Sequence, residues 1–139
     1  MRRIKINFNE KRELNVHKTN KSSALEWLNI WKADDIYFDS NRKYGYGGYK
    51  YDGRWKEIVE KLIIEFSLKK KSTLLDLGCA KGYLVNDYNY NKNVGAAAGV
   101  DISIYALIKG YKEKVRGELF CANFNKLPFD NNEFSLIFC

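Results

Sequence analysis

The pattern of apolar and polar positions changes near residue 72. Between residues 53 and 70 apolar side chains recur at intervals of three and four, which predicts a helix with one buried face and Asp52 as its N-cap. After residue 72 short apolar runs alternate with amphipathic segments. We expect strands at 73–77, 94–100, 118–122 and 134–138, with helices at 81–90 and 103–114 and a loop at 123–133. Strands that alternate with helices indicate an α/β fold with right-handed crossovers and a parallel sheet, in which the runs 74–77 and 134–138 are covered on both faces.

The first 52 residues lack this alternation, so we predict an N-terminal region at 1–52 and a domain at 53–139. The N-terminal region is expected to hold a short strand at Arg3–Phe8 and a short amphipathic helix at 24–31 that starts after Ser22 or Ser23. Residues 37–51 are so rich in Tyr and Gly that we expect a loop without regular structure. That loop is either a lid over a ligand or a surface cluster of tyrosines packed on the 53–70 helix, and the sequence favours neither.

The cysteines and the histidine limit the chemistry. Cys79, Cys121 and Cys139 are an odd number without metal-type spacing, and each lies in or beside an apolar run, so we expect buried, reduced thiols. A single histidine, His17, argues against a zinc site or a serine triad. No apolar stretch is long enough for a membrane span, and the first residues lack the features of a signal peptide. A cytoplasmic protein without a membrane partner is the prediction.

The formal net charge of +7 lies in the first half of the chain. Residues 1–71 contain 17 Lys and Arg against 10 Asp and Glu, whereas residues 72–139 contain 7 of each kind. A basic region can bind nucleic acid or an acidic substrate. The lysines are scattered and no aromatic platform with RNA-binding spacing is present, so we favour a solvated surface and do not expect a nucleic-acid partner.

The most informative segment is the junction between the first predicted strand of the domain and the helix after it. An acidic residue, Asp76, ends the apolar run, and small residues follow at Gly78, Ala80 and Gly82. A turn without bulky side chains lets a ligand approach the backbone, and the start of the next helix offers N–H groups. Lys81 in this turn is expected to be solvated, and Cys79 to contribute its backbone N–H.

A second acidic residue supports a nucleoside site. Asp101 ends the second predicted strand, nineteen positions after Gly82, where a carboxylate can accept both hydroxyls of a ribose. NAD could use the same pair of features. A dinucleotide site, however, needs room for a pyrophosphate, whereas Asp76 at the strand end would repel one and suits a cationic or amino-bearing ligand.

Three segments in order resemble the seven-stranded, Rossmann-like methyltransferases that use S-adenosylmethionine. LLDLGCAKGYL at 74–84 resembles their first motif, with Ala80 in place of the middle glycine, and GVDIS at 99–103 matches their acidic second-strand end. CANFNKLPFDNNEFSLIFC at 121–139 is similar to their third and fourth motif region, with Asn123 where an acid is common. The resemblance covers about residues 53–139.

The resemblance implies S-adenosyl-L-methionine as cofactor and a doubly wound sheet of which this chain carries the strand order 3-2-1-4. It implies cofactor contacts at Asp76, Gly78, Cys79, Ala80, Gly82, Asp101, Ile102, Asn123, Phe124 and Cys139. The expected acceptor is a small molecule, and the substrate or lid candidates are Tyr44, Tyr46, Tyr49, Arg54 and Trp55. Methyl transfer is a direct displacement that mainly needs alignment of the reactants, and no general base is identified.

The resemblance also bears on completeness. Four strands are fewer than the family's seven, so we expect a fragment whose apolar fourth-strand edge is covered by a longer chain, a second copy or a partner. The isolated 139 residues are expected to bind poorly and to catalyse nothing. Two other classes stay open: a cofactor-binding module without catalysis, and an NAD-linked oxidoreductase.

Overall fold

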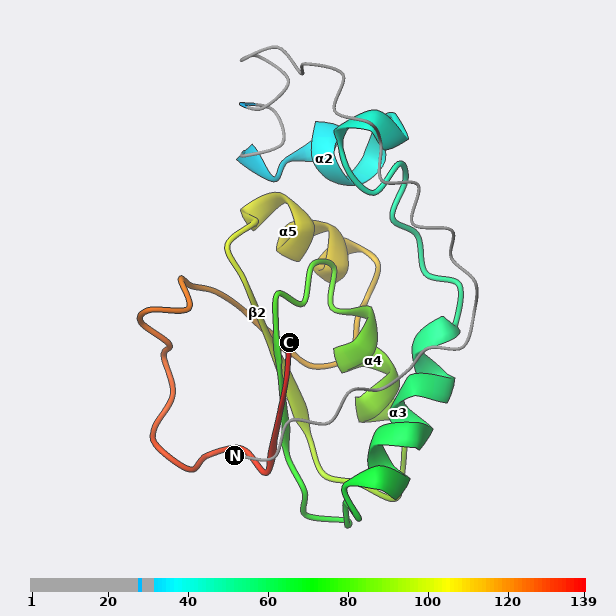
Figure 1. The fold of residues 1–139 in the computed structure, drawn as a ribbon, viewed down its shortest axis with the longest axis vertical. Coiled ribbons are helices and arrows are strands. Elements are labelled where there is room, and N and C mark those ends of the chain that lie inside the picture. The colour runs from blue at the N-terminus through cyan, green and yellow to red at the C-terminus, as the bar shows by residue number, and fades with distance from the viewer. Residues whose placement is uncertain (1–27, 29–31) are drawn as a thin grey trace.

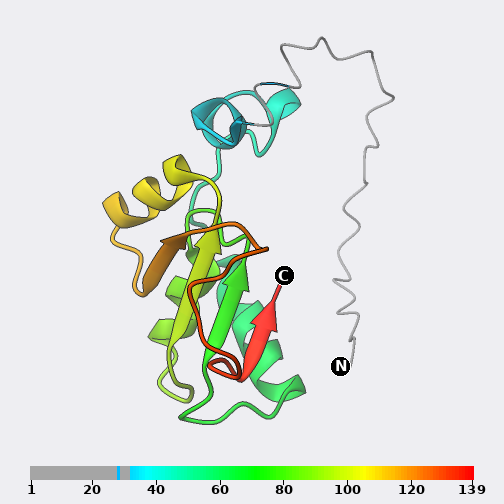
Figure 2. The same ribbon diagram turned by 90° about the vertical axis from the view of Figure 1, so that its left-hand side faces the viewer.

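The computed structural model describes residue 28 and residues 32–139, and it contains one four-stranded parallel sheet (Figure 1). The strand order is β3-β2-β1-β4, and Figure 2 shows the four strands side by side. The strands are β1 Leu74–Leu77, β2 Ala97–Asp101, β3 Glu118–Cys121 and β4 Leu136–Phe138. The α/β class and the 3-2-1-4 order predicted from the sequence are confirmed.

Within the described residues, five helical segments accompany the sheet. They are α2 Asp35–Asp39, the 3-10 helix η1 Arg42–Tyr44, α3 Arg54–Glu65, α4 Tyr83–Tyr90 and α5 Ile104–Lys112. The predictions for a strand at Arg3–Phe8 and, apart from Leu28, for a helix at 24–31 fall outside the described residues.

The two faces of the sheet are covered differently. On one face a core cluster joins Leu74 of β1 to Leu62 of α3, Val85 of α4 and Leu107 of α5. On the other face Leu75, Ala98 and Val100 pack against the apolar side chains of residues 120–134. Figure 1 shows this segment in orange on the left of the sheet. Strands β1 and β2 are therefore buried on both sides, which explains why most of their residues are apolar.

The prediction that the 134–138 run is covered on both faces is wrong for the described residues. Leu136 and Phe138 are half-buried, and the side chain of Ile137 is 52% exposed. Strand β4 pairs with β1 on one side only, because it lies at the edge of the sheet.

Helix α3 is shorter than its periodicity predicted. It ends at Glu65 because Ser67 adopts a left-handed backbone conformation (φ 49°), and the Leu68 N–H donates to the Ile63 carbonyl to close the helix. At the other end the N-cap is Gly53 rather than Asp52, although Asp52 does accept from the Arg54 N–H (3.1 Å). The amphipathic pattern continued past the point where the backbone turns.

The Tyr- and Gly-rich segment is more regular than expected. Phe38 lies in α2, and residues 42–44 form the 3-10 helix η1, so the prediction of no regular element over 37–51 is wrong in its first half. The N-caps of these two short helices are the side chains of Asp34 and Asn41. Only the stretch after Tyr44 is irregular.

The cysteines differ from the prediction in part. All three are free, but only Cys79 is buried, while Cys121 and Cys139 are exposed. Within the described part of the chain no helix has the length and apolar character needed to cross a bilayer.

Candidate functional site

The turn after β1 has the open backbone that its sequence predicted. Gly78, Ala80 and Gly82 all have positive φ angles (83°, 51° and 78°), a conformation that glycine adopts without strain and alanine does not. A Cβ added at Gly78 would meet only the Phe124 ring, at 3.8 Å, so the turn faces open space at this point. The sequence predicted that the Cys79 N–H would be offered to a ligand. In the structure this N–H donates to the Val100 carbonyl (3.0 Å) instead.

Asp101 holds the turn in place. Its Oδ2 accepts from the Ala80 N–H (2.8 Å) and its Oδ1 accepts from the Ser103 N–H (2.8 Å). The first bond fixes the strained Ala80, and the second fixes the chain just before α5. Each carboxylate oxygen has a second lone pair, so Asp101 retains acceptor capacity toward the space beside the turn.

Asp76 lies near Asp101 but has different surroundings. It is 6% exposed, and no side-chain hydrogen bond to it is formed within the described residues. Burial raises the pKa of Asp76 to about 7, and the neighbouring carboxylate of Asp101 adds to the rise. The site thus carries two buried carboxyl groups, one fixed by backbone donors and one without a partner in the described protein.

A pocket of about 410 Å³ opens beside the turn. It is lined by Ala33, Tyr37, Phe38, Tyr46, Gly78, Ala80, Asp101, Ile102, Asn123 and Phe124. Six of the sequence-predicted cofactor residues and one lid candidate, Tyr46, therefore meet at one cavity. Those ten lining residues include no lysine or arginine, which leaves the pocket acidic and aromatic.

Sequence reasoning missed part of this site. Ala33, Tyr37 and Phe38 lie more than thirty residues before the turn, and only the richness in aromatic residues pointed toward them. Tyr46 stacks on Phe38 with ring centroids 5.4 Å apart, and its pKa is raised by burial and by the nearby Tyr37, Asp101 and Asp76. We call Tyr37, Phe38 and Tyr46 the aromatic roof.

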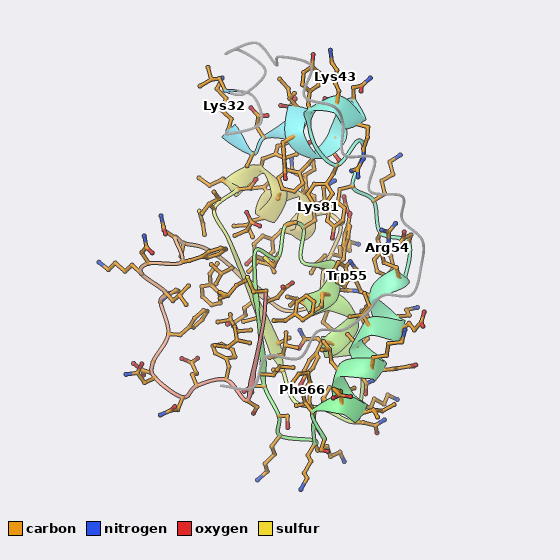
Figure 3. All side chains as sticks on the ribbon, in the orientation of Figure 1. Lys32, Lys43, Arg54, Trp55, Phe66 and Lys81 are labelled. Carbon is orange, nitrogen blue, oxygen red and sulfur yellow. The ribbon has the colours of Figure 1, made fainter. Side chains whose placement is uncertain are left out.

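The prediction that Lys81 is solvated is wrong. Its side chain is 2% exposed, and Figure 3 shows it between α2 and the end of the sheet. The ammonium donates to Asp39 Oδ1 and to the Tyr49 carbonyl, each at 2.7 Å. A lysine in a turn of small residues gave no sign of burial, because its partners come from a distant segment.

Five other candidates lie away from the pocket. Gly82 caps α4 and faces Leu119, and Cys139 is exposed beyond β4. The remaining three are Tyr44 in η1, and Arg54 and Trp55 at the upper end of α3 in Figure 3. Arg54 pairs with Asp52, and Trp55 packs edge-on against Phe138 (6.3 Å between centroids). Tyr49 packs against Tyr46, with ring centroids 4.6 Å apart, and burial raises the pKa of Tyr49.

Comparison with known proteins agrees with this geometry. The sequence profile of a family described as "Methyltransferase domain" matches residues 75–139, which contain the turn, Asp101 and Asn123. This segment is similar to the methyltransferase domain family. The resemblance noted in the sequence is thereby confirmed over these residues, and the sheet has the 3-2-1-4 strand order that the resemblance implied.

The chain is also similar in sequence to two proteins of Methanocaldococcus jannaschii, and in fold to a solved structure. Uncharacterized protein MJ0638 of Methanocaldococcus jannaschii is 37% identical over 83 residues, 60% of this chain and 34% of that protein. A second protein from that organism, MJ1252, is 33% identical over 84 residues, 60% of this chain and 31% of that protein. The chain thus spans about a third of the length of the relatives it matches.

The solved structure comes from Methanococcus maripaludis and is classed provisionally as an S-adenosyl-L-methionine-dependent methyltransferase. It superimposes with a TM-score of 0.54 at 19% identity, over 60% of this chain and 40% of that one. This likeness supports the fold of the domain.

Proposed function

We propose that the protein binds S-adenosyl-L-methionine beside the 78–82 turn and serves methyl transfer to a small-molecule acceptor. The observation that carries the proposal is the pocket, in which Asp101, the open backbone at Gly78 and the Asn123–Phe124 pair converge inside a methyltransferase domain. Asp101 would accept the ribose hydroxyls, Ile102 and Phe124 would cover the adenine faces, and Asn123 would meet its edge. The carboxyl of Asp76, which has no hydrogen-bond partner among the described residues, would face the cationic part of the ligand.

The charge of the site favours this cofactor over NAD. Two buried carboxyl groups lie beside the turn, and the ten lining residues offer no cationic side chain. A pyrophosphate there would meet repulsion without compensation, whereas a sulfonium or an ammonium would be attracted, also by the faces of Tyr37 and Tyr46. When bound, the sulfonium supplies an electrophilic methyl group, and the protein aligns it with the acceptor.

The proposal is tested by titrating the chain with S-adenosylhomocysteine up to millimolar concentration, followed by NMR and calorimetry. NADH serves as the competing ligand. We expect saturable binding of S-adenosylhomocysteine, with resonances of residues 76–82 and 101–103 shifting, and no saturable response to NADH. Absence of binding at millimolar S-adenosylhomocysteine, or tighter binding of NADH, would overturn the proposal.

A matched pair of glycine variants locates the site. Gly78 and Gly53 both have positive φ (83° and 77°), and neither position has a clash for an added Cβ. Valine should strain both backbones alike, but only at position 78 does it fill the pocket. We expect Gly78→Val to weaken S-adenosylhomocysteine by at least about tenfold, or ~1.4 kcal/mol, while Gly53→Val retains the affinity. Equal affinities in the two variants would place the ligand elsewhere.

A further inference from the structure

The buried ammonium of Lys81 joins the cofactor turn to the segment that precedes α3. Its hydrogen bonds to Asp39 and to the Tyr49 carbonyl cross 42 and 32 residues of sequence, and Glu113 lies 3.9 Å away. A buried charge is tolerated only when it is paired and hydrogen-bonded. The environment of Lys81 is therefore complete only while residues 39–49 stay docked on the domain.

The partners of Lys81 are themselves held by tyrosines of the domain. The Tyr105 hydroxyl donates to Asp39 Oδ2 (2.7 Å), so both oxygens of that carboxylate are engaged. Burial alone would raise the pKa of Asp39, but the hydrogen bonds from Lys81 and Tyr105 outweigh it and lower the pKa. The Tyr83 hydroxyl lies 2.6 Å from Glu113 Oε2 and 3.2 Å from the Tyr49 carbonyl. Together these groups form a latch: Asp39, Tyr49, Lys81, Tyr83, Tyr105 and Glu113.

Two residues of the latch, Asp39 and Tyr49, are joined directly to the aromatic roof of the pocket. Tyr37 and Phe38 come directly before Asp39, and the Tyr46 N–H donates to the Tyr37 carbonyl (2.8 Å). The Tyr49 N–H donates to the Phe38 carbonyl (2.9 Å), which ties both ends of the roof together. Displacement of Asp39 and Tyr49 from Lys81 would consequently move all three roof side chains.

Lys81 is also fixed from the side of the domain. A Cβ added at Gly110 of α5 would lie 2.4 Å from the Lys81 carbonyl oxygen, so the backbone of the turn packs directly on that helix. The side chain cannot follow a loose segment outward without moving the turn. Turn and roof are thus mechanically connected through one residue.

We propose that Lys81 is a positioning residue of the cofactor site, which holds the aromatic roof over the pocket through Asp39 and the Tyr49 carbonyl. It need not touch the cofactor. The inference rests on the proposed function for the identity of the ligand, and it concerns the placement of the roof rather than the pocket floor. Ligand binding and roof docking are then coupled, since each stabilises the arrangement that the other requires.

The principal test compares Lys81→Met with Lys112→Met, which removes the same charge from an exposed position of α5. Methionine preserves most of the buried stem of Lys81 and removes its three donors. We expect S-adenosylhomocysteine to bind Lys81→Met about tenfold or more weakly, within the usual range of coupling between two sites. Lys112→Met should bind like the unmodified chain.

Hydrogen exchange separates positioning from general destabilisation. In the unmodified chain the ligand should slow amide exchange both at residues 78–82 and at residues 37–49. In Lys81→Met saturated with ligand, protection should persist at 78–82 and disappear at 37–49. If Lys81 had only a structural role, protection would fall at residues 78–82 and at residues 37–49 together, and that result would overturn the proposal.

A second variant covers the case in which Lys81→Met does not fold. Asp39→Asn weakens the latch from its more exposed side, where the carboxylate is 27% exposed. It should show the same two effects to a smaller degree, and unchanged affinity and exchange in Asp39→Asn would overturn the proposal. Failure of the unmodified chain to bind S-adenosylhomocysteine would instead refute the proposed function, which keeps the two failures distinct.

Discussion

At the scale of single residues, two neighbouring acids have been given different roles by their surroundings. Asp101 accepts two backbone N–H groups, whereas Asp76 accepts none from the described residues and has a pKa raised to about 7. Backbone donors favour a carboxylate, and burial without donors favours the neutral acid. The site therefore holds one carboxylate that is bound by backbone donors, Asp101, and a second carboxyl group, Asp76, whose ionisation a cationic ligand would favour.

Asp76→Asn should stabilise the free chain at neutral pH. Because the pKa of Asp76 in the folded state is about 7, against an ordinary value of 3.8 for an aspartic acid, the folded state binds the proton more tightly than the unfolded state. Its contribution is therefore fully favourable below about pH 4 and is lost as the pH rises to about 7. The amide does not ionise, so the variant should gain a few kcal/mol relative to the unmodified chain over this window, at roughly 1.4 kcal/mol per pKa unit.

Urea unfolding of the free chain and of Asp76→Asn at several pH values measures this difference. Asp35→Asn, which removes an exposed carboxylate of α2, controls for the change in net charge. A difference in unfolding free energy that does not change between pH 4 and pH 7 would show that Asp76 is not destabilised by burial.

Asp101→Ala should lower both stability and ligand affinity. Beside its proposed contact with the ribose, Asp101 has a structural role, because its side chain accepts two backbone hydrogen bonds. Loss of a hydrogen bond to a charged group costs on the order of 1.5–3 kcal/mol, and the left-handed Ala80 would lose its support. Chemical denaturation and calorimetry report the two effects separately. Unchanged stability would mean that the turn holds its conformation without Asp101.

At the scale of elements, α5 packs closely on the turn because a glycine, a poor helix former, stands where the two meet. Gly110 in the middle of α5 is unfavourable for a helix by about 1 kcal/mol relative to alanine. It is buried, and its missing Cβ makes room for the Lys81 carbonyl and for Leu119. The turn therefore lies between α5, which it contacts at Gly110, and the end of β2, to which it is hydrogen-bonded at Val100.

Gly110→Ala should therefore destabilise the chain although alanine is the better helix former. The added methyl group would lie 2.4 Å from a backbone oxygen and 3.0 Å from Leu119 Cδ1, so the turn or the helix must shift. Overpacking of this kind usually costs about 1–3 kcal/mol, more than the gain in propensity. Thermal unfolding of Gly110→Ala beside Lys112→Ala, a substitution on an exposed face of α5, tests this expectation. A higher melting temperature for Gly110→Ala would show that the backbone relaxes without penalty.

Local patterns were sufficient to predict these elements but not their contacts across the chain. The strands were predicted because β1 and β2 are apolar apart from Asp76 and Asp101, and the Gly78–Gly82 spacing marked the turn. The end of α3 was missed because the left-handed Ser67 leaves no mark in the apolar period. Lys81 was misjudged for a similar reason: its burial depends on Asp39 and Tyr49, and sequence distance carries no information about such a pair.

At the scale of the whole molecule, four segments that are distant in sequence form one cavity. Its lining comes from the segment 33–46, which contains the roof, the turn at 78–80, the strand end at 101–102 and the pair at 123–124. Only the last three lie in the segment that matches the methyltransferase domain family. Part of the predicted N-terminal region, within residues 33–46, thus lines the pocket together with residues of the predicted domain.

A bound ligand should consequently protect all four segments at once. Ligand burial between roof and floor excludes water from both sides, and amides that open locally must then wait for the ligand to leave. We expect hydrogen exchange with saturating S-adenosylhomocysteine to slow at 37–46, 78–80, 101–102 and 123–124 with the same midpoint in ligand concentration. Residues 54–65 of α3, on the far side of α4, serve as the internal control and should exchange unchanged. Protection confined to the turn and the strand end would show that the roof takes no part in binding, and would return the Tyr- and Gly-rich segment to a packing role on the surface of the domain.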